Sequence, residues 1–226
     1  MIGHKDQPVK RVLNAGSGPS TLRNLHPAFS TRGWAEVRLD IDPAVKPDII
    51  GSIHDMTQEV PDRSLQAVWS SHNLEHLHSF EVHRALCEFR RVLSDDGFVF
   101  ITCPDLESIA EHLLAHGLTK PAYQSSSGPI TPLDMLFGHG RSIAAGNKYM
   151  CHKTGFTQDT LGRAAIDAGF YEARVAKGSG FDLWGLFSLR GTNQEMLCAM
   201  LENTPQAFLV ERDKAGRNNE RLVRTQ

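Results

Sequence analysis

The chain has 226 residues, of which 40% are hydrophobic and 22% are charged, and its formal net charge is −2. This composition is typical of a globular protein and is too apolar for a disordered chain. The near-neutral charge disfavours nucleic acid as a partner, because nucleic-acid-binding proteins usually carry a basic excess. No apolar run approaches the roughly 20 residues that cross a bilayer, so no membrane partner is expected.

The cellular compartment follows from the N-terminal stretch and the cysteines. The stretch before Gly16 contains no apolar run of signal-peptide length. The four cysteines lie far apart and form no CxxC pair. Scattered thiols in such a chain are typical of a reduced, cytoplasmic protein and not of a disulfide or zinc framework.

Short apolar runs alternate with helical or polar stretches through the first half of the chain. The apolar runs predict strands over residues 11–15, 36–41, 48–51, 65–70 and 97–103. A helix is expected before the last of these strands, because Val82, Leu86 and Phe89 recur at spacings of three and four. Strands alternating with helices predict an α/β fold with a doubly wound, mostly parallel sheet.

The second half of the chain is less regular. Residues 117–153 are rich in Gly, Pro and Ser and are expected to form a loop or a small lid insertion. The remaining patterns predict helices over 107–116, 157–168 and 193–201, and strands over 170–176 and 183–190 that can pair antiparallel. We therefore expect a single domain over residues 1–202, followed by a charged tail over 203–226.

A glycine turn follows the first predicted strand. Gly16 and Gly18 permit positive φ and let a ligand approach the bare backbone. Asp40 ends the next strand, 24 residues after Gly16, where a carboxylate can accept hydrogen bonds from both hydroxyls of a ribose. Thr21 stands where a dinucleotide fingerprint has its third glycine, which disfavours a nicotinamide cofactor. Taken singly, each feature is also compatible with an ordinary turn.

Two more segments follow predicted strands. Asp55 can accept from an exocyclic amine or cap a helix, and Met56 can pack on a purine face. The segment from His72 to His76 matches HxxEH, an inverted zinc-protease signature with two histidines one helical turn apart. A catalytic zinc site also needs a third ligand and a long supporting helix, so we expect no metal and keep a zinc hydrolase as an alternative.

Taken in order, these motifs resemble the class I S-adenosylmethionine-dependent methyltransferases of the small-molecule, methyltransferase domain 11-like type. The stretches that carry the resemblance, within residues 10–190, are 12–18, 39–43, 51–56, 71–77, 88–97, 153–157 and 168–170. The sequence departs from the family at Asn14, where an acid is usual, at Ser20, where a third glycine is usual, and at Gln66, where Asp is usual. These departures leave a non-catalytic nucleoside-binding module as a second alternative.

The resemblance implies a Rossmann-like, seven-stranded sheet, mostly parallel, with an antiparallel C-terminal strand. It also implies S-adenosylmethionine as cofactor and an in-line methyl transfer to a small-molecule acceptor that the sequence does not name. The cofactor contacts that it implies are Asn14, Gly16, Ser17, Gly18, Asp40, Ile41, Asp55, Met56 and Ser71.

The same resemblance places the end of the fourth strand beside the methyl group of the cofactor. His72 is therefore the candidate general base, with orientation of the loop as the alternative role. Acceptor contacts are expected from the long loop and its flank, at His139, Tyr149, His152 and Phe156. The oligomeric state is left open by the sequence.

Overall fold

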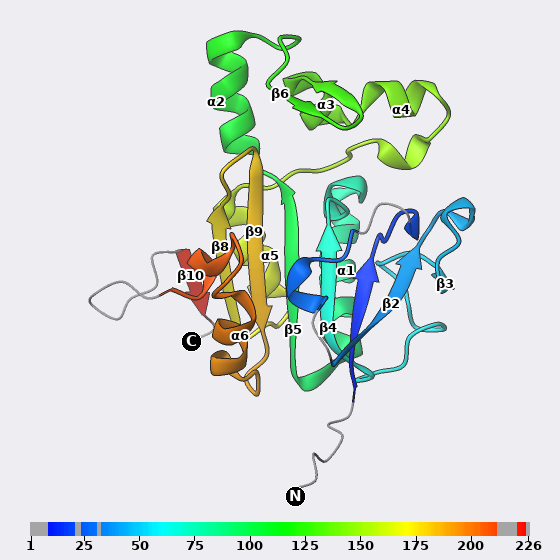
Figure 1. The fold of residues 1–226 in the computed structure, drawn as a ribbon, viewed down its shortest axis with the longest axis vertical. Helices are drawn as coiled ribbons and strands as arrows, with labels where there is room; N and C mark the ends of the chain where they lie inside the picture. Colours follow the sequence, from blue (N-terminus) through cyan, green and yellow to red (C-terminus); the bar gives the residue numbers. More distant parts are fainter. Residues whose placement is uncertain (1–8, 21–23, 31–32, 212–220, 225–226) are drawn as a thin grey trace, which may run out of the picture.

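The structure is a computed structural model that describes residues 9–20, 24–30, 33–211 and 221–224, so Thr21 lies outside the described residues. One sheet of eight strands forms the centre of the molecule, in the order β10-β8-β9-β5-β4-β1-β2-β3 (Figure 1). Its strands are β1 (Lys10–Ala15), β2 (Trp34–Asp40), β3 (Ile49–Ile50), β4 (Leu65–Ser71), β5 (Leu93–Pro104), β8 (Glu172–Lys177), β9 (Asp182–Ser188) and β10 (Arg221–Arg224).

The pairing of the strands confirms the predicted mixed sheet. β1 pairs parallel with β2 and β4, β2 pairs parallel with β3, and β4 pairs parallel with β5. β9 lies between β5 and β8 and runs antiparallel to both, as expected for the last strand of the predicted seven. β10 is an eighth strand, formed by part of the predicted tail, and pairs antiparallel with β8.

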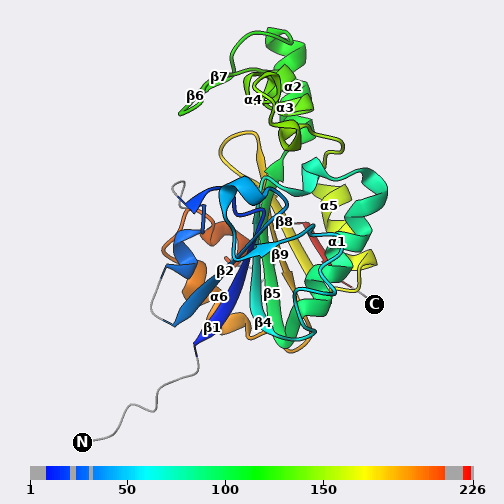
Figure 2. The ribbon, with the colours of Figure 1, turned by 90° about the vertical axis from the view of Figure 1, so that its right-hand side faces the viewer.

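Both faces of the sheet are covered, which explains the buried apolar runs within its central strands. α1 (Ser79–Val92) and α5 (Gln158–Asp167) cover one face, and α6 (Gln194–Leu201) lies with η2 (Pro27–Phe29) and η6 (Ala207–Leu209) on the other (Figure 2). Neighbouring strand residues alternate between two core clusters: Leu13 and Val68 belong to the first, and Val12 and Ala67 to the second.

The connections between the first three strands differ from the predicted βαβ pattern. Among the described residues, the β1–β2 connection contains the 3₁₀ turn η2, and the β2–β3 connection contains the 3₁₀ turn η3 (Pro43–Val45), with no α-helix in either. Pro27 and Pro43 each begin one of these turns. Proline lacks an amide hydrogen and disfavours a helical residue before it, which keeps these segments short.

Residues 106–153, called the cap below, fold into a small unit of their own. The segment 117–153, predicted as a loop or a small lid insertion, follows α2 (Leu106–His116) and contains β6 (Tyr123–Ser125), β7 (Gly128–Ile130), α3 (Pro132–Phe137), α4 (Gly140–Ala144) and η5 (Lys148–Met150). Ile109, Ile130 and Met135 form a separate core cluster, against which Phe181 packs. The cap therefore has its own packing instead of being an extended loop.

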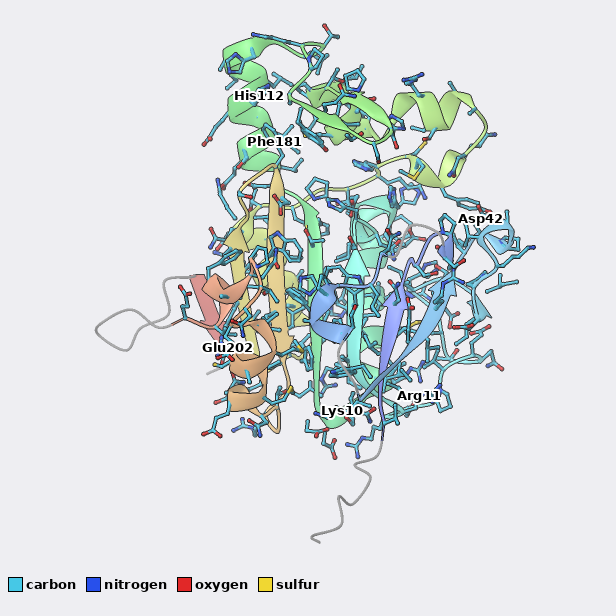
Figure 3. The ribbon with its side chains drawn as sticks, in the orientation of Figure 1. Lys10, Arg11, Asp42, His112, Phe181 and Glu202 are labelled. Carbon is cyan, nitrogen blue, oxygen red and sulfur yellow. The ribbon has the colours of Figure 1, made fainter. Side chains whose placement is uncertain are left out.

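The cap stands at one end of the strands, above the edge where β1, β4 and β5 finish (Figures 1 and 2). In Figure 3, Lys10 and Arg11 mark the opposite end of the sheet, where β1 begins, and Asp42 lies near the end of β2. The carboxyl ends of the parallel strands therefore face the cap, and open α/β sheets bind ligands at this edge. In the described part of the chain, no helix has the length and apolar character that crossing a membrane requires.

Candidate functional site

The turn after β1 is held against β2 by backbone hydrogen bonds. Gly16 and Gly18 have φ of +74° and +58°, which glycine adopts without strain. The amide groups of Gly16 and Ser17 both donate to the carbonyl of Leu39, at 2.9 and 3.0 Å. A Cβ atom built on Gly16 would lie 2.5 Å from Cγ of Asn73, so the turn also needs glycine for space.

Asp40 ends β2 and holds the same turn. Its Oδ2 accepts from the amide of Gly18 at 2.8 Å, and its Oδ1 accepts from the amide of Asp42 at 2.9 Å. Arg38 completes the arrangement by donating to the carbonyl of Gly18 at 2.6 Å. Each carboxylate oxygen has a second lone pair, so Asp40 can accept further hydrogen bonds from a ligand. Ile41 follows with 47% of its surface exposed, which leaves an apolar side chain beside this carboxylate.

Buried polar atoms collect at the ends of β1, β4 and β5. Four of them have no hydrogen-bond partner among the residues that the structure describes: Asn14 Oδ1, Ser70 Oγ, Asn73 Nδ2 and Thr102 Oγ1. The strand register places Ala15 opposite Ser70 and Ser71 opposite Thr102. Burying a polar atom without a partner costs about 1–3 kcal/mol, so these atoms are suited to bind a polar ligand at this edge.

The segment after β3 fits the sequence prediction in part. Asp55 is exposed, and the hydrogen bond from the Thr57 hydroxyl lowers the pKa of its carboxyl. Met56 is 0% exposed and belongs to the main core cluster, where its amide donates to Glu88 at 2.7 Å. The expected packing of Met56 on a purine is therefore corrected, because its side chain points into the core. Of the predicted cofactor contacts that follow β2 and β3, Asp55 and Ile41 are accessible.

The chain leaves β4 through a strained residue. Ser71 is the last residue of β4 and is partly buried, and His72 follows with φ of +48° and donates its amide to Thr102. The His72 side chain is 54% exposed, and its Nδ1 lies 3.3 Å from Oε1 of Glu75, whose side chain is 1% exposed. Positive φ is uncommon outside glycine, and such strain clusters at functional sites.

The contact between His72 and Glu75 shifts the pKa of both groups. Desolvation lowers the pKa of His72, but contact with the Glu75 carboxylate outweighs it and the pKa is raised. Burial raises the pKa of Glu75, and the contact with His72 outweighs that effect, so the carboxyl pKa is lowered. The structure therefore places a histidine in contact with a buried carboxylate where β4 ends.

The HxxEH segment does not form the helix of a zinc protease. Only Leu74–His76 is helical, as the 3₁₀ turn η4, and His72 precedes that turn in a left-handed conformation. Two histidines that share a metal in this signature must lie one turn apart on a continuous α-helix. The geometry therefore gives the zinc-hydrolase alternative no support.

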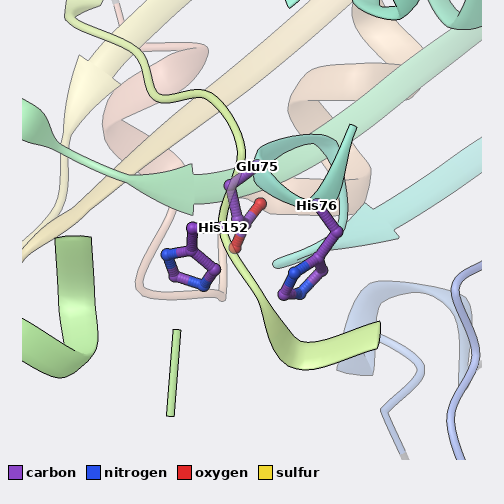
Figure 4. Close-up of side chains that lie close together, drawn as sticks. All are labelled: Glu75, His76 and His152. Atoms are coloured by element: carbon purple, nitrogen blue, oxygen red, sulfur yellow. The ribbon is translucent and has the colours of Figure 1, made fainter. Parts of the chain in front are cut away.

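Glu75 and His76 instead meet a histidine from the cap. Glu75, His76 and His152 each offer one atom that can bind a metal ion, and these three atoms lie within 4.8 Å of one another (Figure 4). The amide of Lys153 donates to the carbonyl of Glu75 at 2.8 Å, which joins the returning chain of the cap to η4. Burial lowers the pKa of His152. The sequence predicts His152 as an acceptor contact and carries no signal for its contact with Glu75 and His76.

The other predicted acceptor residues are spread over the cap. His139 precedes α4 and its Nδ1 lies 2.7 Å from the Ser142 hydroxyl, and Tyr149 in η5 is half exposed. Phe156 is buried in the main core, and its carbonyl accepts from the amide of Leu106. Phe156 is thus a packing residue at the base of the cap, which corrects its expected place in an acceptor pocket.

Comparison with known proteins places these features in context. Residues 13–101 match a family described as "Methyltransferase domain". No curated protein sequence matches the chain.

Solved structures resemble the chain at low sequence identity. A SAM dependent methyltransferase from Archaeoglobus fulgidus is 13% identical, with a TM-score of 0.54, over 79% of this chain and 86% of that one. The PH0226 protein of Pyrococcus horikoshii OT3 is 13% identical, with a TM-score of 0.53, over 83% and 84%. A chain of a Haloferax volcanii complex that contains the Trm112 methyltransferase activator is 15% identical, with a TM-score of 0.50, over 80% and 83%. At these identities the likeness establishes the fold.

Proposed function

We propose that the protein, whose residues 13–101 match the methyltransferase-domain family, transfers a methyl group from S-adenosylmethionine to a small-molecule acceptor bound beneath the cap. One observation carries the proposal. A glycine turn, the carboxylate of Asp40 and the four unpartnered buried polar atoms converge on the edge where β1, β2, β4 and β5 end. A ligand with several separate polar groups fits such an edge.

The residues at this edge fit the parts of S-adenosylmethionine. Asp40 can accept from the ribose hydroxyls with the lone pairs that the turn leaves free. Asn14 offers a buried amide oxygen to the charged amino-acid end of the cofactor, and Thr102 offers it a buried hydroxyl group. Ile41 offers an apolar surface to the adenine, and Asp55 an exposed carboxylate to its amino group.

When bound, the cofactor supplies an electrophilic sulfonium methyl group, so the protein has to align the acceptor and exclude water. The cap suits both tasks, because it stands over this edge of the sheet (Figure 1). Among the described residues, most of the exposed large apolar side chains belong to the cap: Leu114, Leu118, Tyr123, Leu133, Phe137 and Tyr149. In this proposal, Phe137 and Tyr149 contact an acceptor that is partly apolar.

The proposed role of His72 is to accept the acceptor's proton when methylation requires its loss. Its side chain is half exposed at the end of β4, and the buried Glu75 orients the ring, which is the usual arrangement of a histidine base and its supporting carboxylate. Replacing His72 with Asn should lower turnover about 100-fold while leaving the affinity for S-adenosylhomocysteine within twofold. If turnover and the affinity for S-adenosylhomocysteine fell by the same factor, the role of His72 would be limited to orienting the loop.

Formation of S-adenosylhomocysteine tests the proposal. The protein would be incubated with S-adenosylmethionine and either the low-molecular-weight or the macromolecular fraction of a cell extract. We expect product only with the small molecules, and less product from a Phe137→Ala/Tyr149→Ala variant that still binds S-adenosylhomocysteine. Product only with the macromolecules would refute a small acceptor. Cofactor binding without product from either fraction would indicate a nucleoside-binding module.

We also place the protein in the cytoplasm. Its four cysteines, Cys87, Cys103, Cys151 and Cys198, all lie within the described residues and are free thiols. Persistent free thiols are typical of reducing compartments. Fractionation of cells that produce the protein would test this placement.

A further inference from the structure

We propose that Glu75, His76 and His152 bind one divalent transition-metal cation, of the kind represented by Zn²⁺, which fastens the cap to the end of β4. The inference concerns a site separate from the cofactor residues. The first support for this metal site is geometric, because the three ligand atoms, one from each residue, lie within 4.8 Å of one another (Figure 4). Moving these atoms by a small distance would bring them to the 2.0–2.2 Å at which imidazole nitrogen and carboxylate oxygen bind Zn²⁺.

The carboxylate of Glu75 is the second support. The side chain is 1% exposed, Nδ1 of His72 lies 3.3 Å from Oε1, and Oε2 has no hydrogen-bond partner within the described part of the chain. A buried negative charge is costly unless a cation or several donors compensate for it. The contact with His72 involves Oε1, so Oε2 can bind a cation while that contact remains.

The two histidines are held in the tautomer that binds metals. Nδ1 of His76 lies 3.1 Å from the carbonyl of Cys151, and Nδ1 of His152 lies 2.9 Å from the carbonyl of Met135. A carbonyl oxygen only accepts hydrogen bonds, so each Nδ1 carries the proton and each Nε2 keeps its lone pair. Metal-bound histidines usually donate a hydrogen bond from the N–H of their second ring nitrogen to a backbone carbonyl or a carboxylate in this way.

The ligand set indicates which cation fits. Two imidazoles and one carboxylate suit zinc and similar transition metals, whereas calcium and magnesium prefer oxygen ligands. Three protein ligands leave the fourth tetrahedral position for water or for a polar group of the acceptor.

The position of the ligands indicates what the cation does. Glu75 and His76 belong to η4, and His152 lies where the chain returns from the cap. The backbone already joins these segments, since the amides of Lys153 and Thr154 both donate to the carbonyl of Glu75. A cation at this junction would fix the cap over the edge of the sheet.

The experiment uses the full chain, freed of metal with a chelator and titrated with Zn²⁺ by calorimetry. We expect one ion per chain and a rise in melting temperature with Zn²⁺. His76→Gln and His152→Gln should each weaken binding about 100-fold, since each removes one of three ligands. His116→Gln is the matched control, because His116 is an exposed histidine on α2 outside the cluster, and its affinity should stay within twofold.

Folding and cofactor binding are checked separately. Metal-free His152→Gln should keep the melting temperature of the metal-free parent within a few degrees and should still bind S-adenosylhomocysteine. Absence of Zn²⁺ binding by the parent chain would overturn the proposal, and so would equal affinities in the parent and both cluster variants. Failure of the parent chain to bind S-adenosylhomocysteine would instead count against the proposed function.

Discussion

Replacing Gly16 with Ala tests the close contact between the turn after β1 and the loop after β4. The new Cβ atom would lie 2.5 Å from both Cγ and Nδ2 of Asn73, closer than any two such atoms approach without displacement. Gly16 also has φ of +74°, where an alanine is strained. Both effects act on a turn that two backbone hydrogen bonds hold against β2, so the strain cannot be relieved by moving the turn freely.

The loss of unfolding free energy that we expect for Gly16→Ala has two parts. The left-handed conformation costs an alanine about 1–2 kcal/mol. Displacing Asn73 from a packed position costs about 1–3 kcal/mol more, as for other overpacked sites. Gly16→Ala should therefore lower the free energy of unfolding by about 2–5 kcal/mol. Asn73→Ala alone should cost little, because Nδ2 has no hydrogen-bond partner among the residues described.

A double-variant cycle measured by urea unfolding separates these parts. In the Gly16→Ala/Asn73→Ala chain the steric part should disappear, which would recover about 1–3 kcal/mol while the backbone part remains. Gly16→Ala should also weaken S-adenosylhomocysteine binding at least tenfold. A loss under about 0.5 kcal/mol for Gly16→Ala, or strictly additive effects in the cycle, would refute the contact.

Two further predictions concern charged side chains away from the site, Arg174, which is buried, and Glu88, which is partly buried. Arg174 is buried and contacts Glu172, α6 and η6, so Arg174→Met should lower the free energy of unfolding by about 3 kcal/mol. The exposed control Arg163→Ala should lower it by less than about 1 kcal/mol. Similar losses in the two variants would contradict this prediction. Hydrogen bonds from Arg91 lower the pKa of Glu88 from its ordinary 4.5, so Glu88 stabilises the fold above that pH and loses its contribution as the pH falls further. Acid unfolding of Glu88→Gln should accordingly depend less on pH below about 4.5 than that of the parent, and parallel curves would exclude this contribution.

The central strands and the glycine turn were predictable because local signals determine them. The apolar runs within β1, β4 and β5 are buried, and an uninterrupted or nearly uninterrupted run of hydrophobic and small residues marks the buried part of each strand. The cap was not predictable in the same way. Its small core includes Phe181, which comes from the loop between β8 and β9, far along the chain. Long-range packing of this kind leaves no periodicity in the cap itself.

The site shows the same limit for single side chains. Met56 and Phe156 stand in motif segments, but the sequence does not tell whether an apolar residue there faces the ligand or the core. The HxxEH pattern drew attention to His72 and His76 as neighbours, whereas the fold brings His152 to Glu75 and His76. That juxtaposition depends on where the cap returns to the sheet, which only the tertiary structure determines.

Calorimetric titration with S-adenosylhomocysteine tests the central claim most directly, with NADH as the control ligand. We predict one-to-one binding of S-adenosylhomocysteine to the parent chain and no binding of NADH. Asp40→Asn should weaken binding about 10–100-fold, because hydrogen bonds to a charged group contribute about 1.5–3 kcal/mol. Failure of the parent to bind S-adenosylhomocysteine, or unchanged affinity in Asp40→Asn, would contradict the account.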